Sequence, residues 1–367
     1  MYLNFDFIYT KNKIFFCKGM NIVMKKIAFF DAKPYDKIYF DKYCEEYGFT
    51  VKYIEYKLNG ETAYMAKGTD AVCAFVNDEI NQETIDILHS LNIRIIAMRC
   101  AGYNNIDFKH AYKKIHVVRV PEYSPYAIAE HAAALLLCLN RKIHKAYNRT
   151  REYNFSLNSL MGFDLNGKTI GIVGTGKIGR AFISICKGFN LKVIAHDPYP
   201  VKDLDVEYVT FDELCKRSDI ISLHCPLTKD THYIINDESI SKMKDGVYII
   251  NTSRGALIDS KVLLEALRSK KIGAAGLDVY EEETELFYED LSYQVIDDEI
   301  IAGLISMPNV IVTSHQAFLT HEALSNIAKT TLSNLKDYFS DKLLLNEICY
   351  KCEKGEACSK KTGENCF

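Results

Sequence analysis

The sequence predicts an α/β protein with two parallel-sheet domains, and three observations lead to this prediction. Residues 24–121 alternate short apolar runs with amphipathic stretches of helical period, which is typical of a parallel sheet. A second series of the same kind occupies residues 168–314, and one long apolar-then-amphipathic stretch, 125–150, lies between the two. A length of 367 residues is enough for about two domains.

The elements of the first series follow from its apolar runs. Strands are predicted at 26–30, 50–56, 71–75, 93–98 and 116–118, and helices at 37–47 and 82–91. The stretch 125–150 is predicted to be one helix that connects the domains, because it is too long for a loop and too short for a membrane span.

The second series predicts a complete nucleotide-binding type of sheet. Its strands are expected at 169–173, 192–195, 220–223, 247–251, 274–279 and 310–313. An amphipathic helix at 321–340 is expected to return to the first domain and make it discontinuous. The predicted domains are therefore 24–123 with 320–346, and 124–319, with an N-terminal extension at 1–23 and a cysteine-rich tail at 347–367.

A glycine-rich turn opens the second series. Gly174, Gly176 and Gly179 form a GxGxxG pattern between a strand and a helix, and Asp197 ends the next apolar run. This context indicates a Rossmann-like fold, in which the turn approaches a pyrophosphate and the acid accepts hydrogen bonds from a ribose. A carboxylate there would repel a 2′-phosphate, so NAD is favoured over NADP. The alternative is a glycine-rich βα turn that binds no ligand.

Composition bounds the compartment and the partners. A net charge of −3 gives no basis for a nucleic-acid or anionic membrane partner, and no apolar run approaches the ~18 residues of a membrane span. Residues 1–23 lack the apolar core and cleavage site of a secretory signal; an early translation start or a disordered arm would explain them. Eight cysteines are scattered along the chain: Cys17, Cys44, Cys73, Cys100, Cys138, Cys186, Cys215 and Cys225. Most of them lie in apolar runs, which favours a reducing cytoplasm.

Three side chains of the second domain are candidates for chemistry on a 2-oxo acid. Arg254 and His315 each follow a predicted strand, at the carboxyl edge where open α/β sheets bind ligands. A guanidinium can hold a carboxylate and polarise a carbonyl, and an imidazole can donate and accept a proton near neutral pH. A surface arginine and a structural histidine are the alternatives, and residue type alone leaves them open.

An acid close to the imidazole would complete this chemistry. Glu283 follows another predicted strand, and a carboxylate beside an imidazole stabilises its protonated form. Glu281, Glu282 and Glu285 lie close by, so charge alone does not select among them. The alternative is a solvated acidic loop.

These features together resemble the D-isomer-specific 2-hydroxyacid dehydrogenase family. The resemblance covers nearly everything between residues 25 and 346, and it rests on segments 99–107, 120–125, 174–179, 224–228, 251–259, 278–281 and 315–320. Segments 140–147, 285–290 and 315–320 are similar to the fermentative D-lactate dehydrogenases in particular. The resemblance implies two domains with a cleft between them, NAD as cofactor and a homo-oligomer, either a dimer or a tetramer.

The resemblance also implies residue roles. Arg254 would bind the substrate carboxylate and polarise the 2-oxo group, His315 would be the acid/base, and Glu283 would be its partner. Tyr123 and backbone N–H groups near Cys100, Ala101 and Gly102 would contact the substrate. The residues expected to contact NAD are Gly174, Gly176, Lys177, Ile178, Gly179, Asp197, Cys225, Pro226, Thr231, Thr252, Ser253, Arg254 and Asp278.

The activity implied is reduction of pyruvate to D-lactate by hydride transfer from NADH. Two alternatives remain at this stage. One is the same chemistry on a bulkier 2-oxo acid, such as 2-oxoisocaproate. The other is an NAD(H)-binding interaction protein of the same fold that senses redox state.

The tail departs from the family pattern. It carries four cysteines, and four thiolates can bind zinc or an iron–sulfur cluster; they are Cys349, Cys352, Cys358 and Cys366. The paired CxxC spacing of common zinc folds is missing. The alternative is a polar, reduced tail without metal.

Overall fold

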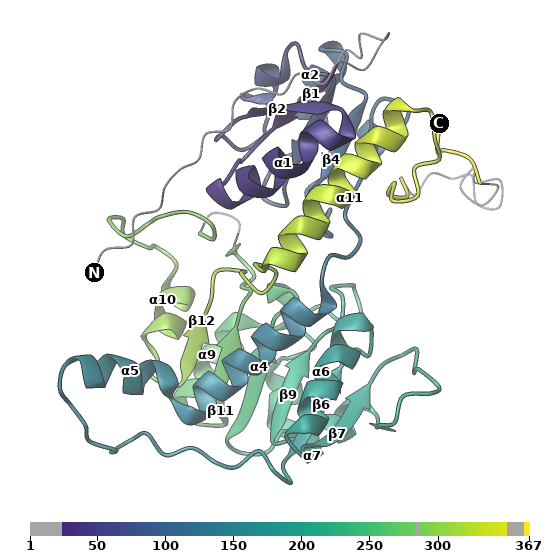
Figure 1. Ribbon diagram of the computed structural model, residues 1–367. Coiled ribbons are helices and arrows are strands. Elements are labelled where there is room, and N and C mark those ends of the chain that lie inside the picture. Colours follow the sequence, from purple (N-terminus) through teal and green to yellow (C-terminus); the bar gives the residue numbers. More distant parts are fainter. Residues whose placement is uncertain (1–23, 284–285, 351–362) are drawn as a thin grey trace. The chain divides into compact units, whose positions relative to one another are not determined.

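The computed structural model describes residues 24–283, 286–350 and 363–367. The chain divides into two compact units, and each is treated separately below (Figure 1). Unit 1 comprises Met1–Arg119 and Thr331–Phe367, and unit 2 comprises Val120–Thr330. The predicted extension at 1–23 lies outside the described residues.

Unit 1 contains a five-stranded parallel sheet in the order β2-β1-β3-β4-β5. Its strands are β1 (Lys25–Phe29), β2 (Phe49–Tyr53), β3 (Ala71–Ala74), β4 (Ile95–Met98) and β5 (His116–Val118). All residues of β3 and β4 are buried, as expected for central strands of a parallel sheet covered on both faces.

The helices of unit 1 begin and end at recognisable signals. Gly48, with a φ of 85°, ends α1 (Pro34–Tyr47), and the Asn81 side chain caps α2 (Gln82–Ser90). A short 3-10 turn, η1 (Ala63–Ala66), and α3 (Phe108–Ala111) complete the first part of the unit.

The C-terminal part of unit 1 packs against this sheet. From Thr331 onward, α11 (His321–Phe339) belongs to unit 1, and Leu332 and Leu335 are fully buried. Beyond α11 the chain pairs antiparallel with β5 through Val118 and Glu347. The helix predicted at 321–340 therefore contributes its second half to the unit that contains the N-terminal sheet.

Unit 2 contains a seven-stranded parallel sheet in the order β12-β11-β10-β9-β6-β7-β8. The strands are β6 (Thr169–Val173), β7 (Lys192–His196), β8 (Glu207–Tyr208), β9 (Ile220–Leu223), β10 (Val247–Asn251), β11 (Ile272–Leu277) and β12 (Val310–Val312). The strand order reverses between β6 and β9, and open α/β sheets bind dinucleotides across such a switch point.

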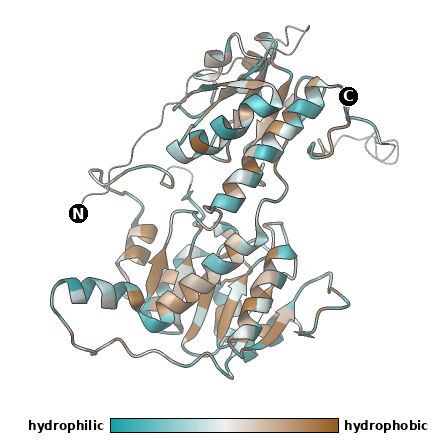
Figure 2. Ribbon diagram, viewed as in Figure 1, coloured by the Kyte–Doolittle hydropathy of each residue, from teal (hydrophilic) through white to brown (hydrophobic). Residues whose placement is uncertain are grey.

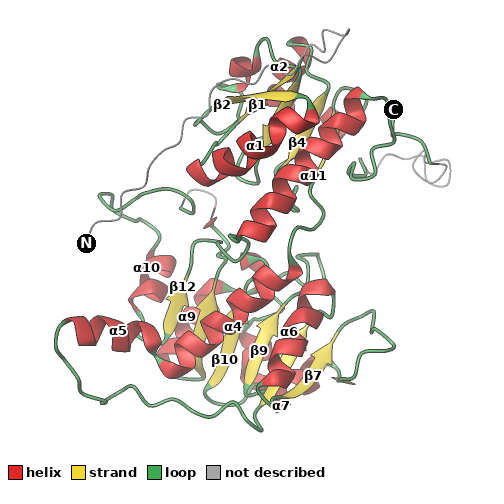
Figure 3. Ribbon diagram, viewed as in Figure 1, coloured by secondary structure: helices red, strands yellow, loops and turns green. Residues whose placement is uncertain are grey.

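Helices cover both faces of the unit 2 sheet (Figure 3). One face packs against α4 (Pro125–Arg141) and α6 (Lys177–Gly188). The other packs against α7 (Phe211–Arg217), α8 (Asp237–Lys242), α9 (Ser260–Arg268) and α10 (Glu299–Ser306). Successive strand residues alternate between the two cores, so the strands are mostly apolar (Figure 2).

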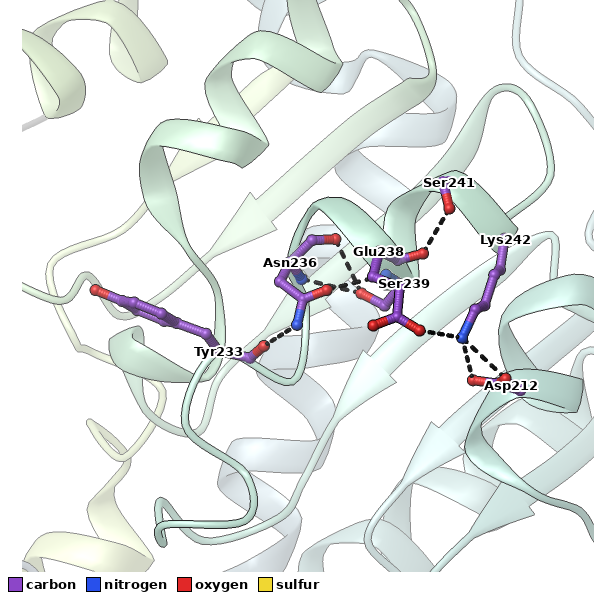
Figure 4. A network of polar contacts seen from close by, with 7 residues as sticks. All are labelled: Asp212, Tyr233, Asn236, Glu238, Ser239, Ser241 and Lys242. Carbon is purple, nitrogen blue, oxygen red and sulfur yellow. Dashed lines mark hydrogen bonds and ion pairs between the residues drawn. The ribbon is translucent and has the colours of Figure 1, made fainter.

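A polar network fixes α8 against α7 at the surface (Figure 4). Asn236 and Ser239 form a reciprocal capping box at the start of α8. Lys242 Nζ then donates to Asp212 on α7 at 2.9 Å and to Glu238 at 2.7 Å. The capping box satisfies backbone groups at the start of α8, whereas the exposed ion pairs contribute little stability.

The prediction of two parallel-sheet domains is confirmed, and two details of it are wrong. The stretch 125–150 is two helices, α4 and α5 (Ile143–Arg151), because Lys142 adopts a left-handed conformation with a φ of 51°. The second sheet has seven strands and not the six predicted. The edge strand β8 was missed because it contains only Glu207 and Tyr208, which form no apolar run.

Candidate active site

The glycine turn after β6 fits a dinucleotide. Gly174 has a φ of 95°, and a Cβ there would lie 2.6 Å from the His224 carbonyl oxygen. A Cβ at Gly179 would lie 2.1 Å from the Gly174 carbonyl oxygen, so α6 approaches the turn only because this residue is glycine. A Cβ at Gly176 would meet nothing within 4 Å, so the backbone at the start of α6 stays open to a pyrophosphate.

Asp197 lies beside this turn at the end of β7. Its Oδ2 accepts from the Thr175 N–H at 2.6 Å and the Thr175 hydroxyl at 2.9 Å, and its Oδ1 accepts from the Tyr199 N–H at 2.8 Å. Burial opposes the charge of this carboxylate, but these hydrogen bonds outweigh burial, and the pKa of Asp197 lies below its ordinary value. The charged carboxylate keeps lone pairs for the ribose hydroxyls.

The other residues predicted to contact NAD also follow strands of this sheet or open α6. Lys177 and Ile178 begin α6, where Lys177 forms an ion pair with Glu122. The Thr252 hydroxyl is buried and has no hydrogen-bond partner in the described part of the chain, which suits a bound group. The rest lie in the loops after β9, β10 and β11: Cys225, Pro226, Thr231, Ser253, Arg254 and Asp278. Their contacts with NAD stay predictions.

Arg254 is presented by a tight turn after β10. The Asn251 side chain stabilises this turn with two hydrogen bonds: its amide N–H donates to the Arg254 carbonyl at 2.8 Å, and its Oδ1 accepts from the Ser253 N–H at 3.0 Å. A Cβ at Gly255 would lie 2.0 Å from the Tyr280 carbonyl carbon, so the turn packs tightly against the loop that follows β11. The guanidinium forms no ion pair with any residue among those described. The half-buried cation is therefore available to an anionic ligand.

Glu283 and His315 meet directly. His315 Nδ1 donates to Glu283 Oε1 at 2.9 Å, and Glu283 Oε2 accepts from the Tyr280 N–H at 3.1 Å. Because one carboxylate oxygen is taken by the backbone, the other is aimed at the imidazole. Nε2 of His315 forms no hydrogen bond within the described residues and is the nitrogen that can exchange a proton with a ligand.

A buried carboxylate holds the loop that carries His315. Asp278 is fully buried, and its Oδ1 accepts from the Thr313 hydroxyl at 2.6 Å and the Gln316 N–H at 2.9 Å. Its Oδ2 accepts from the Ala317 N–H at 2.9 Å, and His131 Nε2 on α4 lies 3.3 Å from Oδ1. The sequence predicted a cofactor contact for Asp278, whereas this anchoring role was missed because it depends on residues distant along the chain.

The predicted substrate residues fall in both units. Tyr123 in unit 2 packs edge-on against Phe318, with ring centroids 6.2 Å apart, and its carbonyl accepts from the Asn326 side chain at 2.7 Å. Ala101 and Gly102 lie in unit 1, in the loop that follows β4. Within the described residues, Arg254 forms no hydrogen bond or ion pair with Glu283 or His315. Strands β10, β11 and β12 are neighbours, however, so the loops that carry the three residues share one sheet edge.

Comparison with known proteins now decides the family. Residues 133–317 match the D-isomer specific 2-hydroxyacid dehydrogenase, NAD binding domain. The D-lactate dehydrogenase of Escherichia coli is 47% identical over 88% of this chain and 99% of its own. This chain belongs to the D-isomer-specific 2-hydroxyacid dehydrogenase family. It is an NAD-dependent enzyme, and unit 2 contains its NAD-binding domain.

Solved structures of relatives share the fold. The apo-structure of D-lactate dehydrogenase from Escherichia coli has a TM-score of 0.82 at 45% identity and covers 88% of this chain and 100% of its own. The structure of D-2-hydroxyisocaproate dehydrogenase has a TM-score of 0.79 at 33% identity, with 88% of this chain and 99% of its own covered. This chain is thus similar to family members that are named for a small substrate and to one that is named for a larger substrate.

Two of the four tail cysteines lie within the described residues. Cys352 and Cys358 lie outside the described residues, whereas Cys349 is exposed and Cys366 is buried. Within residues 24–283, 286–350 and 363–367, no group of metal-ligating side chains is assembled. Over the same residues, no helix is long and apolar enough to cross a membrane. The metal hypothesis for the tail stays a prediction.

We predict that His224 makes stability fall on acidification. His224 lies under the glycine turn, and burial lowers its pKa from 6.5 to about 3. Its Nε2 meets the Ser222 hydroxyl at 2.9 Å, and its Nδ1 has no partner in the described structure. The unfolded chain binds this proton more readily than the folded protein does. The contribution of the neutral histidine to the free energy of unfolding is therefore fully present above about pH 6.5 and is lost as the pH falls toward 3.

Urea unfolding at a series of pH values tests this. His224→Asn should unfold with a shallower dependence on pH below about pH 6.5 than the wild type. His232→Asn, at an exposed histidine of the same unit, is the matched control and should keep the wild-type slope. Equal slopes for all three proteins would contradict the assignment.

Proposed function

We propose that this protein reduces pyruvate to D-lactate with NADH. The main support for this proposal is the hydrogen-bonded pair of Glu283 and His315, which lies at the same sheet edge as Arg254. The relatives named D-lactate dehydrogenase, at 47% identity in Escherichia coli and 46% in Curvularia clavata, support the choice of substrate.

Arg254 binds and orients the substrate in this proposal. Its planar fork suits two oxygens of the substrate, one from the carboxylate and one from the 2-oxo group. The positive charge also stabilises the negative charge that develops on the 2-oxo oxygen. Bound NADH supplies the hydride that reduces carbon 2.

His315 delivers the proton that accompanies this reduction. The protonated imidazole donates from Nε2 to the carbonyl oxygen, and Glu283 stabilises the cation before transfer. In the reverse direction the neutral ring accepts the hydroxyl proton, so one residue serves both directions. The Asp278 anchor fixes the ring and so limits the geometries that it samples.

A bulkier 2-oxo acid is the second candidate substrate. The similarity to D-2-hydroxyisocaproate dehydrogenase, at 33% identity and a TM-score of 0.79, favours this alternative. The 47% identity to the D-lactate dehydrogenase of Escherichia coli, together with the two aromatic rings of Tyr123 and Phe318, supports the smaller substrate. Relative kcat/KM for pyruvate and 2-oxoisocaproate separates the two.

We expect Arg254→Gln to reduce kcat/KM for pyruvate by about a hundredfold, because a charge-assisted fork is lost. The KM should rise and turnover should fall, measured as NADH oxidation. Arg268→Gln, at an exposed arginine ending α9 in the same unit, is the control and should behave as the wild type. Unchanged kinetics in the Arg254 variant would remove Arg254 from the site.

We expect His315→Ala to bind NADH as the wild type does but to lose turnover by about a thousandfold, as general acid catalysis is removed. Glu283→Gln keeps a hydrogen-bond acceptor without the charge, so it should lose less turnover than His315→Ala does. His232→Ala is the control. Substantial turnover in the His315 variant would mean that another group donates the proton.

We also propose a homo-oligomer, because unit 2 exposes an apolar arm. Helix α5 buries no residue, and the chain that follows it exposes large apolar side chains. Large apolar side chains that stay exposed along one segment favour an interface. The arm consists of Ile143 (58% exposed), Tyr147 (58%), Tyr153 (85%), Phe155 (70%), Leu157 (82%) and Met161 (87%).

Light scattering tests this arrangement. The double substitution Phe155→Glu and Leu157→Glu should convert the oligomer to monomer, because charge in an apolar interface is costly. Ile38→Glu, at an exposed apolar residue of unit 1, is the control and should leave the mass unchanged. A monomeric wild type would contradict the proposal.

A further inference from the structure

The loop after β4 in unit 1 presents backbone donors that no described residue accepts from. The N–H groups of Ala101 and Gly102 donate no hydrogen bond within residues 24–283, 286–350 and 363–367, and both residues are half-buried. Unused N–H groups in a partly buried loop are suited to an anion such as a carboxylate. The direction in which these groups point depends on how the loop is held.

Arg119, the residue that follows β5, holds this loop. Its guanidinium donates from Nη1 to the Ala101 carbonyl at 2.7 Å and lies over the Tyr103 ring, 4.9 Å from the centroid. The Ala101 carbonyl and the Gly102 N–H belong to one peptide group, and the described residues contain no cis peptide. In a trans peptide the two bonds point in opposite directions, so Arg119 aims the Gly102 N–H away from itself.

A hydrogen bond from a cation also changes the strength of this donor. The charge of Arg119 draws electron density toward the Ala101 oxygen and polarises the Gly102 N–H as a donor. The next peptide is constrained as well, since the Cys100 thiol lies 3.3 Å from the Gly102 carbonyl oxygen. The two contacts fix consecutive peptide groups of the loop.

The backbone of Arg119 is itself fixed by the C-terminal part of unit 1. Its carbonyl accepts from the Asn334 side chain on α11 at 2.9 Å, and its N–H donates to the Asn346 carbonyl at 3.1 Å. The Asn346 side chain in turn donates to Asn334 Oδ1 at 2.8 Å. A continuous chain of contacts therefore leads from α11 to the loop at Ala101.

We propose that Arg119 is a positioning residue for substrate carboxylate binding, which it controls by orienting and polarising the Ala101–Gly102 peptide. This assignment rests on the proposed function, because it requires a substrate with a carboxylate. Arg119 acts through the loop and is not itself a catalytic residue. A carboxylate is bound equally in the ground state and in the transition state, so the effect falls on KM rather than on kcat.

The test compares two arginines of unit 1 that both hydrogen-bond to backbone carbonyls. Arg119→Gln should raise the KM for pyruvate about tenfold with kcat within about twofold, because a charge-assisted hydrogen bond is lost. Arg119→Lys keeps the charge and one donor, and should raise KM about threefold. Arg94→Gln is the matched control, because Arg94 binds the His89 and Ile93 carbonyls just before β4, at the other end of that strand from the loop.

Two further readouts separate positioning from general damage. The dissociation constant for NADH should be unchanged in every variant, since the predicted NAD residues lie in unit 2. The inhibition constant of oxamate, a carboxylate analogue of pyruvate, should rise in parallel with KM. If Arg119→Gln fails to fold, Arg119→Lys and Arg94→Lys form the comparison, with the threefold difference expected.

The outcomes are distinct. An active wild type with unchanged KM in the Arg119 variants would overturn this assignment alone. Equal losses in KM and in NADH binding would overturn it as well, because they would indicate damage to the whole protein. A wild type that reduces no 2-oxo acid would overturn the proposed function and this assignment together.

Discussion

The candidate active site depends on the buried carboxylate of Asp278. Three donors from residues 313–317 converge on it, and together they close the loop after β12 onto the end of β11. This closure places His315 against Glu283, although His315 has a left-handed backbone with a φ of 52°. A residue other than glycine holds such a conformation only where its surroundings impose it, and strain of this kind is often found at functional sites.

The parallel sheet of unit 2 brings the other residues of the candidate site together with few additional contacts. The carboxyl ends of β10, β11 and β12 lie side by side, so the three loops that follow them bring Arg254, Glu283 and His315 to one edge. The glycine turn follows β6 at the same edge, next to the point where the strand order reverses. Topology thus places the glycine turn and His315 at this edge, and individual hydrogen bonds such as that between His315 and Glu283 adjust the side chains.

Much of this arrangement could be predicted from the sequence. Buried parallel strands are short apolar runs, so their ends, and with them Arg254 and His315, were predicted within a few residues. Charge could not select Glu283 among its acidic neighbours; that choice came from the family resemblance, and the contact with His315 is now observed. The break at Lys142 and the edge strand β8 carry no local signal. The roles of Asp278 and Arg119 depend on contacts between distant residues, which periodicity does not reveal.

The substrate and the stereochemistry of the product can be measured in one assay. Wild-type protein and NADH are mixed with pyruvate, 2-oxobutyrate or 2-oxoisocaproate, NADH loss is followed by absorbance, and the product is resolved on a chiral column. We expect the highest kcat/KM with pyruvate, and D-lactate as its product. L-lactate as product, or no turnover of any of the three acids despite tight NADH binding, would contradict it.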